Sequence, residues 1–288
     1  ETGLGGRFDA TRIVPGELCL LTSIQLEHRD ILGETLAEIA AEKAAIARPN
    51  KAMLVREIQD TEARSAIEYE ARHAGQEYLG ELPSPASLEW IHIDSDSSMK
   101  EEAMTLAKAT LNHLNFNIDS LDESMLALNW PGRMQHIEPM SWGGSLFVDA
   151  AHNPSGLKRV IPTLVDLLSS QQEWSLVFGC TPKDDLEEFV QPLLELCKKH
   201  PPTNVLLTVP QTGRHPGVSI AKLVEFDWHC LKSVIPASNS KETRQVLDKI
   251  QPEYTLAIGS LYLIGELFEV LRLSGSKHLE LFPPNTQR

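Results

Sequence analysis

The chain has 288 residues, of which 42% are apolar and 23% charged, and its 26 basic against 40 acidic residues give a formal charge of −14. This is the composition of a globular protein with enough chain for one large or two ordinary domains. The acidic excess argues against non-specific binding to nucleic acid or to an anionic membrane, since both depend on clustered Lys and Arg. No apolar run approaches the ~20 residues of a membrane span.

The four cysteines form no CxxC pair, so the sequence predicts free thiols rather than a zinc or redox site. The chain opens ETGLGGRFDAT, without an initiating Met and without a signal region, and we expect it to be a piece of a longer protein.

The first part of the chain alternates short apolar runs with amphipathic stretches. Its expected strands are residues 17–24, 51–58, 77–80 and 88–94, and its expected helices are residues 33–47, 61–75 and 98–115. The segment LNWPGRMQ at 128–135 brings Trp, Pro and Gly together and interrupts this alternation. We therefore predict two domains, 1–130 and 131–288.

The second part has the regular βα rhythm of a parallel sheet. Expected strands are 145–150, 174–179, 204–210, 228–234 and 255–260, with helices near 155–170, 183–199, 217–225, 239–250 and 261–273. The fold class is thus α/β, with an open doubly wound sheet in this part. Such sheets bind their ligands beyond the carboxyl ends of the strands.

Oxygen-rich side chains accompany the three closely spaced glycines of the opening segment. Glu1 and Asp9 offer ligands for Mg²⁺, and the glycines permit a backbone to approach a phosphate; an ordinary glycine turn is the alternative. His28 follows an expected strand directly after Glu27, which suits a metal or phosphate site, although a lone loop histidine is more often merely exposed.

Lys43 falls on the apolar stripe of the expected helix 33–47, at i+7 from Leu36 and between Ala40 and Ala47. A buried ammonium is costly unless it is paired, neutralised or modified. The alternative is that the side chain extends along the surface and leaves its head group in water.

The segment DAAHNP, residues 149–154, ends the first strand of the second part. Asp149 is placed for a ribose hydroxyl and His152 for a phosphate or carboxylate, while Asn153 is a preferred helix cap. Arg133 lies at the expected domain junction, where a guanidinium suits a phosphate. The sequence contains no GxxxxGK[ST] phosphate loop, no GxSxG and no HExxH, so the residues alone indicate an α/β enzyme with a phosphate-like site.

Several blocks together resemble folylpolyglutamate synthase and dihydrofolate synthase of the Mur ligase superfamily. They are ETGLGGRFDATRIV, TSIQLEHRDILGETLAEIAAEKAAI, WPGRMQ, FVDAAHNPSG and IGSLYLIGEL, in the family's order and with similar spacing. The resemblance implies part of a P-loop-type ATPase domain without its phosphate loop, followed by a Rossmann-like C-terminal domain.

The resemblance also implies an activity, a set of ligands and roles for seven residues. The family's enzymes are cytoplasmic, monomeric ligases that use ATP and Mg²⁺ to join L-glutamate to a folate or pteroate carboxylate through an acyl phosphate. The matching residues are Glu1 and His28 for metal, a carboxylated Lys43 for catalysis, Arg133 and Asp149 for ATP, His152 near the transferred phosphate or the amino acid, and Asp9 in the substrate site.

Three departures from the family and two rival interpretations accompany this reading. The family's usual Asp-His pair is Glu27-His28 here, which keeps the carboxylate. An Asn of the family that touches nucleotide has no counterpart here, where Glu101 and Glu102 stand near its position. The family's phosphate loop precedes the start of this chain, so we expect the 288 residues alone to be inactive. The alternatives are a peptidoglycan-type amino-acid ligase and an inactive fragment that acts only as a binding protein. The sequence does not separate dihydrofolate synthase from folylpolyglutamate synthase.

Overall fold

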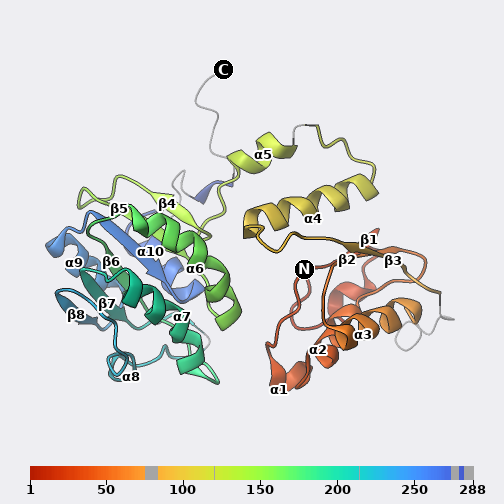
Figure 1. Cartoon of the computed structure of the whole chain (residues 1–288), viewed down its shortest axis with the longest axis horizontal. Coiled ribbons are helices and arrows are strands. Elements are labelled where there is room, and N and C mark those ends of the chain that lie inside the picture. The colour runs from red at the N-terminus through yellow and green to blue at the C-terminus, as the bar shows by residue number, and fades with distance from the viewer. Residues whose placement is uncertain (75–83, 120, 214, 274–278, 282–288) are drawn as a thin grey trace. The chain divides into compact units, whose positions relative to one another are not determined.

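The computed structural model describes residues 1–74, 84–119, 121–213, 215–273 and 279–281. The chain folds into two compact units, Glu1–Met125 and Leu126–Arg288, and each is described by itself (Figure 1). The limits 1–130 and 131–288, and the assignment of these parts to Mur ligase domains, stay predictions.

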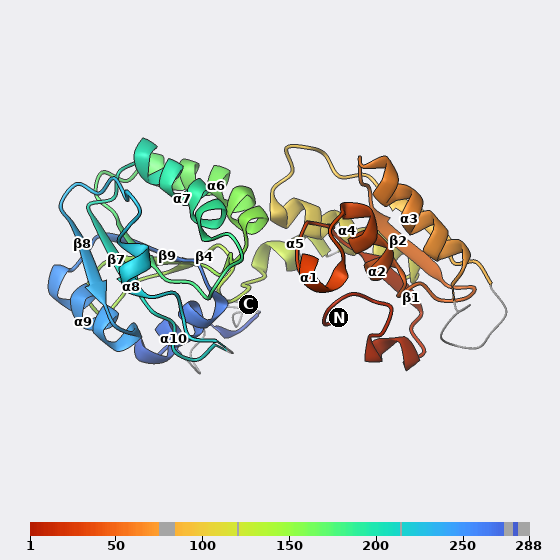
Figure 2. The ribbon, with the colours of Figure 1, turned by 90° about the horizontal axis from the view of Figure 1, so that it is seen from below.

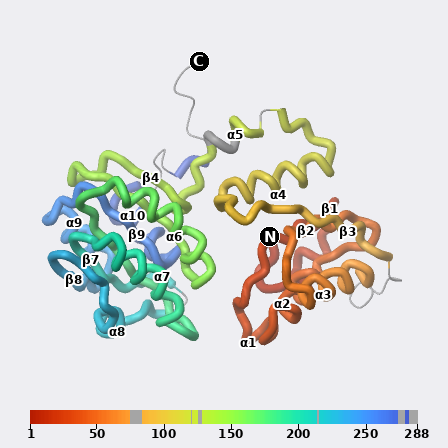
Figure 3. The backbone as a smooth tube through the Cα atoms, viewed as in Figure 1, coloured from red at the N-terminus to blue at the C-terminus, as the bar shows by residue number. Residues whose placement is uncertain are grey.

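The first unit is built on a parallel sheet of order β1-β2-β3. Its strands are β1 (Leu18–Leu21), β2 (Ala52–Arg56) and β3 (Ser87–Ile91). Its helices are η1 (Ala10–Ile13), a 3-10 helix, then α1 (Arg29–Leu32), α2 (Leu36–Ala44), α3 (Thr61–Arg72) and α4 (Met99–His113), and α5 (Leu121–Ala127) runs across the division. Helices α2 and α3 lie side by side on one face of the sheet, and α4 lies on the other (Figures 1 and 3).

The alternation of side chains along β2 explains this layering. Met53 and Val55 join the apolar cluster formed with α2 and α3, whereas Leu54 joins the smaller cluster formed with α4. All three side chains are buried. Central strands of parallel sheets are apolar throughout for this reason, since helices cover both faces.

Local capping sets the limits of the two helices beneath the sheet. Thr35 and Glu38 form a reciprocal capping box, so α2 begins at Leu36 rather than at residue 33. It ends at Ala44, before the expected limit of residue 47. The Asp60 carboxylate caps α3 by accepting from the backbone N–H of Ala63 at 2.8 Å.

The second unit is a six-stranded sheet of order β4-β5-β9-β6-β7-β8. Its strands are β4 (Gln135–Ile137), β5 (Ser145–Asp149), β6 (Ser175–Phe178), β7 (Asn204–Thr208), β8 (Ser233–Ala237) and β9 (Tyr254–Ile258). Its helices are α6 (Pro154–Ser169), α7 (Leu186–Lys199), α8 (Ile220–Leu223), α9 (Ser240–Ile250) and α10 (Leu261–Val270). Helices α6 and α7 cover one face and α9 and α10 the other (Figure 2). The expected doubly wound α/β sheet is confirmed.

Three local expectations for this unit were wrong. Strand β4 pairs antiparallel with β5 and was not predicted. The segment 228–232 is a loop, because Trp228 is buried and donates its indole N–H to the Leu223 carbonyl. The strand begins only at Ser233, and it tolerates Pro236 because β8 is an edge strand. The expected helix 217–225 is reduced to the four residues of α8.

The cysteines are free thiols, as predicted, and three of the four are buried. In the part of the chain that the structure describes, no helix is long and apolar enough to cross a bilayer. The strand expected at 77–80 lies outside the described residues.

Candidate functional site

The glycine-rich opening segment packs directly against α2. The backbone N–H of Gly6 donates to the Glu42 carbonyl at 2.7 Å. A Cβ on Gly6 would lie 2.7 Å from both the Lys43 carbonyl oxygen and the Ile46 nitrogen, closer than a side chain can approach. Gly5 has a φ of +70°, a conformation that favours glycine. The glycines therefore allow a close backbone approach between this segment and the helix that carries Lys43.

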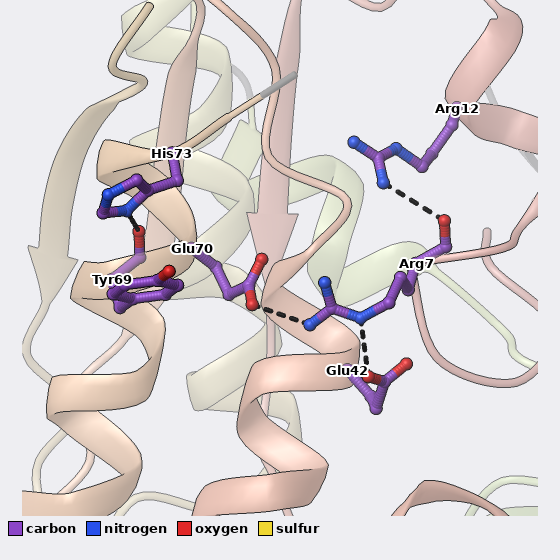
Figure 4. A network of polar contacts seen from close by, with 6 residues as sticks. All are labelled: Arg7, Arg12, Glu42, Tyr69, Glu70 and His73. Carbon is purple, nitrogen blue, oxygen red and sulfur yellow. Dashed lines mark hydrogen bonds and ion pairs between the residues drawn. The ribbon is translucent and has the colours of Figure 1, made fainter. Parts of the chain in front are cut away.

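Arg7 ties the same segment to two helices (Figure 4). Its Nε donates to Glu42 of α2 and its Nη2 to Glu70 of α3, both at 2.6 Å. Burial of Arg7 works against the charged form, but the bonds to Glu70 and Glu42 outweigh it and raise the arginine's pKa. Arg12 adds a further tie by donating to the Arg7 carbonyl at 3.1 Å.

Asp9 organises the turn that follows the glycines. One carboxylate oxygen accepts from the backbone N–H and the hydroxyl of Thr11, and the other accepts from the backbone N–H of Gly3. The side-chain bond to Thr11, followed by the two backbone bonds, lowers the pKa of Asp9 to about 2. Asp9 is thus an anion and the N-cap of η1. Its expected role in the substrate site stays a prediction.

The two residues expected to bind metal and the expected catalytic lysine come from segments that meet in this unit. Glu1 precedes the glycine turn, His28 precedes α1 in the left-handed conformation (φ 54°), and Lys43 lies in the last turn of α2. The loop is in contact with both helices, because a Cβ on Gly5 would lie 3.0 Å from Leu32 of α1. Glu1 and His28 are exposed.

Lys43 is half-buried, although Ala40 and Ala47 on the same stripe are buried. Lys43 lies one residue before the end of α2, whose last residue is Ala44. None of the described residues forms an ion pair or a hydrogen bond with its ammonium group. The amine thus lies free of carboxylates at the end of a helix packed against the glycine segment.

Among the residues that the structure describes, no three His, Cys, Asp or Glu side chains are grouped to hold a metal ion. Mg²⁺ does not require such a cage, because it is bound by one or two carboxylates together with water and phosphate oxygens. Glu1 and a carboxylated Lys43 fit that donor set. The His28 nitrogen fits it less well, since Mg²⁺ prefers oxygen ligands.

Glu101 and Glu102, which stand near the missing Asn of the family, both have structural partners. Glu101 forms a capping box with Ser98 at the start of α4. Glu102 is buried and pairs with Arg56 at the end of β2, with nitrogen–oxygen distances of 3.0 Å to each of its carboxylate oxygens. Glu102 and Arg56 thus form an ion pair that links the carboxyl end of β2 to α4.

A histidine between two acids lies beside that pair, at the same edge of the sheet. His92 Nδ1 lies 2.7 Å from Glu57 and Nε2 lies 3.4 Å from Asp94. The bond to Glu57, more than the nearby charges of Glu57 and Asp94, raises the pKa of His92. This contact contributes stability while Glu57 is ionised and His92 is protonated. The contribution is lost as the pH rises through the raised pKa of His92, or falls through the lowered pKa of Glu57.

We expect Glu57→Gln to lower the titration midpoint of His92 toward its ordinary value, because the substitution removes the principal partner of the imidazolium. NMR titration of the imidazole resonances measures this shift. Asp94→Asn is the matched control and should lower the midpoint by less. A larger shift in Asp94→Asn than in Glu57→Gln contradicts the arrangement.

In the second unit, Asp149 ends β5 and holds the turn in front of β4. Its side chain is buried, and its two oxygens accept from the backbone N–H groups of Met134 and Ala151 at 2.9 and 2.8 Å. Burial raises the pKa of Asp149, while the two amides and the charges of Arg133 and His152 oppose the rise. Each oxygen still has capacity for a second donor, such as a ribose hydroxyl.

The structure brings Arg133 and His152 to the same end of β5. Both are exposed, and both act electrostatically on the Asp149 carboxylate. The Nδ1 of His152 contacts the Ala150 carbonyl at 3.0 Å, so Nδ1 carries a proton, and Nε2 is an acceptor in the neutral form of the imidazole. Asn153 caps α6 by accepting from Gly156 N–H at 2.6 Å, as the sequence predicted. Three of the seven expected residues thus gather at one sheet edge.

Two charged residues near this edge were not predicted from the sequence. Lys183 follows β6 and donates to the Thr181 hydroxyl at 3.1 Å, and burial lowers its pKa. Glu266 of α10 is buried and accepts four hydrogen bonds. A sequence signal existed for Glu266, because it lies three residues after Leu263 and one before Leu267, on the buried face of its helix.

Both units are α/β units, and charged residues lie at the carboxyl ends of their parallel strands. This defines the class of α/β proteins that bind their ligands at that edge of the sheet. No family model matches the chain. Among curated proteins, it is 32% identical over 190 residues to the dihydrofolate synthase/folylpolyglutamate synthase of Bacillus subtilis, a match covering 57% of this chain and 43% of that protein. It is 26% identical over 310 residues to the dihydrofolate synthetase of Saccharomyces cerevisiae, covering 94% of this chain and 70% of that protein.

Solved structures show the same fold. Escherichia coli FolC in complex with DHPP and ADP superposes with a TM-score of 0.73 at 22% identity, over 96% of this chain and 66% of that one. The bifunctional enzyme of Yersinia pestis, complexed with AMPPNP and Mn ion, gives a TM-score of 0.69 at 22% identity, over 94% of this chain and 65% of that one. The similarity to the folylpolyglutamate synthase and dihydrofolate synthase family, and its α/β fold, are therefore confirmed.

Proposed function

We propose that this chain is part of an ATP-dependent ligase that joins L-glutamate to dihydropteroate or to a folate. The observation that carries the proposal is the similarity to a dihydrofolate synthetase along 94% of the chain, which includes both units. The chain spans 43% of the Bacillus subtilis relative, so the activity belongs to the protein from which the sequence comes. The proposed state is a monomer, and the proposed compartment is the cytoplasm.

The chemistry explains why a nucleotide is needed. A carboxylate resists attack by an amine because its oxygen is a poor leaving group. Transfer of the γ-phosphoryl group of ATP to that oxygen gives ADP and an acyl phosphate. The glutamate nitrogen then forms a bond to the carbonyl carbon, the bond from carbon to the phosphate-bearing oxygen breaks, and inorganic phosphate leaves. The amine gives up a proton as the amide forms.

The residues at the end of β5 suit the nucleotide. The Arg133 guanidinium is exposed and neutralises phosphate charge, which an acidic protein otherwise repels. Asp149 accepts ribose hydroxyls with the capacity that Met134 and Ala151 leave free. His152 presents an acceptor nitrogen, Nε2, which suits a proton from the attacking amine or a hydrogen bond to it.

The residues of the first unit suit the phosphates and the folate carboxylate. Bound Mg²⁺ would neutralise the phosphate oxygens and orient the phosphoryl group for transfer. Glu1 would hold it, together with His28, and a carboxylated Lys43 would add an anion from the end of α2. Carboxylation removes the positive charge of a half-buried amine that has no carboxylate partner among the described residues. Asp9 would lie in the substrate site, and its low pKa keeps its carboxylate ionised there.

The test is a ligation assay on the full-length protein. Release of phosphate that requires ATP, Mg²⁺, L-glutamate and dihydropteroate supports dihydrofolate synthase activity, and release with tetrahydrofolate as acceptor supports folylpolyglutamate synthesis. Activity only on a UDP-sugar peptide assigns the protein to the peptidoglycan ligases. Binding of ligands without turnover on any acceptor contradicts the proposal and leaves a binding protein.

A further inference from the structure

The block IGSLYLIGEL contains a buried carboxylate whose partners are all hydrogen-bond donors. Glu266 Oε1 accepts from the backbone N–H groups of Gln211 and Thr212 at 2.6 and 2.7 Å, and from the Thr212 hydroxyl at 2.9 Å. Its Oε2 accepts from the Ser240 hydroxyl at 2.5 Å. The side chain is 7% exposed. A buried carboxylate that accepts four short hydrogen bonds holds the donating groups in fixed positions.

The segment that Glu266 fixes is the loop directly after β7, at the carboxyl edge of the sheet. Two consecutive backbone amides of this loop, at Gln211 and Thr212, have no partner in a sheet or helix and depend on the carboxylate. The next residue, Gly213, lies close to the neighbouring loops: a Cβ there would be 3.3 Å from the Tyr262 ring and 3.4 Å from the Thr181 methyl. Glu266 thereby determines how closely the β7 loop approaches the first turn of α10 and the loop after β6.

A cation that forms no ion pair with the described residues lies on the β6 loop that this contact supports, and the charge of the neighbouring Asp184 acts on it. The Lys183 ammonium is half-buried, donates to the Thr181 hydroxyl at 3.1 Å and lies 5.2 Å from the centre of the Phe189 ring. Within the described part of the chain, no carboxylate lies within ion-pair distance of it. A partly desolvated ammonium with a neutral partner is suited to a carboxylate from a ligand.

We propose that Glu266 is a positioning residue that holds residues 211–213 against Thr181, so that the edge formed by β6, β7 and β9 is shaped for the carboxylates of the incoming amino acid. Arg133 and Asp149, the residues proposed to bind the nucleotide, lie elsewhere on this edge: Arg133 just before β4 and Asp149 at the end of β5. The structure describes no hydrogen bond between either residue and Glu266. This inference rests on the proposed function for the identity of the amino acid.

The test compares Glu266→Met with Glu266→Gln in the full-length protein. Methionine has a similar length but accepts none of the four bonds, so we expect the KM for glutamate to rise by about tenfold or more, while the KM for ATP changes less than twofold. Glutamine keeps its carbonyl for Gln211 and Thr212 and donates to the Ser240 oxygen, so it should remain close to the unaltered protein. Glu269→Met, on the exposed side of α10, is the matched control and should change nothing.

Two further measurements separate positioning from simple loss of fold and from failure of the proposed function. Hydrogen exchange at the Gln211 and Thr212 amides should accelerate in Glu266→Met while α6 and β5 keep their protection. Calorimetric affinity for L-glutamate should fall in the same variant, whether or not ligation occurs. Unchanged exchange and affinity, or equal rises in both KM values, would overturn the proposal. A protein that binds glutamate in this way but joins it to no acceptor refutes the ligase and leaves the positioning role standing.

Discussion

Replacement of Lys43 by alanine in the full-length protein is expected to lower the ligation rate by at least about 100-fold, the size of effect seen when one electrostatic stabiliser is removed from an active site. The thermal unfolding temperature should hardly change. Lys43 has no ion pair or hydrogen bond among the described residues, and alanine is a good helix former at this place near the end of α2. A steady-state assay with a parallel melting curve measures both quantities.

The choice of further substitutions at Lys43 distinguishes a carboxylated lysine from an ordinary cation. Lys43→Arg keeps the positive charge but cannot be carboxylated, so it should be as inactive as Lys43→Ala. Lys43→Glu supplies an anion on a shorter side chain and should recover part of the lost rate. Incubation with ¹³C-labelled bicarbonate should give a carbamate signal that Lys43→Arg lacks. Ligation by Lys43→Arg at the normal rate would falsify a carboxylated Lys43.

The elements that the sequence predicts well are those whose signals are local. Strands β6 and β7 are short, apolar and buried, and α6 and α7 carry a continuous apolar stripe, so their periodicities identify them. The strand was predicted too early because the segment 228–231 has the composition of a strand. In the structure, Trp228 donates to the carbonyl of Leu223, five residues earlier, and packs on Phe178, which lies far away in the sequence. The contact with Phe178 is a tertiary interaction, so the sequence of the segment itself does not reveal it.

The candidate site likewise contains residues that local sequence signals identify and residues that depend on distant contacts. Asp149 and His152 could be identified because they directly follow a predicted strand, at the edge where α/β sheets bind ligands. The sequence left both a buried and a water-facing Lys43 open, and the side chain is half-buried near the end of α2. The helix ends earlier than its apolar pattern suggests, in contact with a glycine segment more than thirty residues earlier in the chain. The partners of Glu266 lie 26 to 55 residues away and have no local signature.

The contact between the glycine segment and α2 predicts that Gly6→Ala destabilises the first unit by about 2–3 kcal/mol, the upper part of the range for overpacking. The added methyl group would lie 2.7 Å from two backbone atoms, the oxygen of Lys43 in the last turn of α2 and the nitrogen of Ile46 just after the helix. Backbone atoms at the end of a packed helix cannot move aside as the tip of a side chain can. The loop must therefore move away and lengthen the 2.7 Å hydrogen bond from Gly6 to Glu42.

Gly3→Ala is the matched control, because the same methyl group there would meet only the Asp9 carboxylate, at 3.8 Å. Urea unfolding followed by circular dichroism should show a lower midpoint for Gly6→Ala and an unchanged one for Gly3→Ala. Hydrogen exchange should locate the loss in α2 and leave the second unit protected. In the full-length protein, Gly6→Ala should also weaken activity, because the displaced segment carries Glu1 and Asp9 and lies against the helix of Lys43. Equal midpoints for the two variants would show that this close approach is absent in solution.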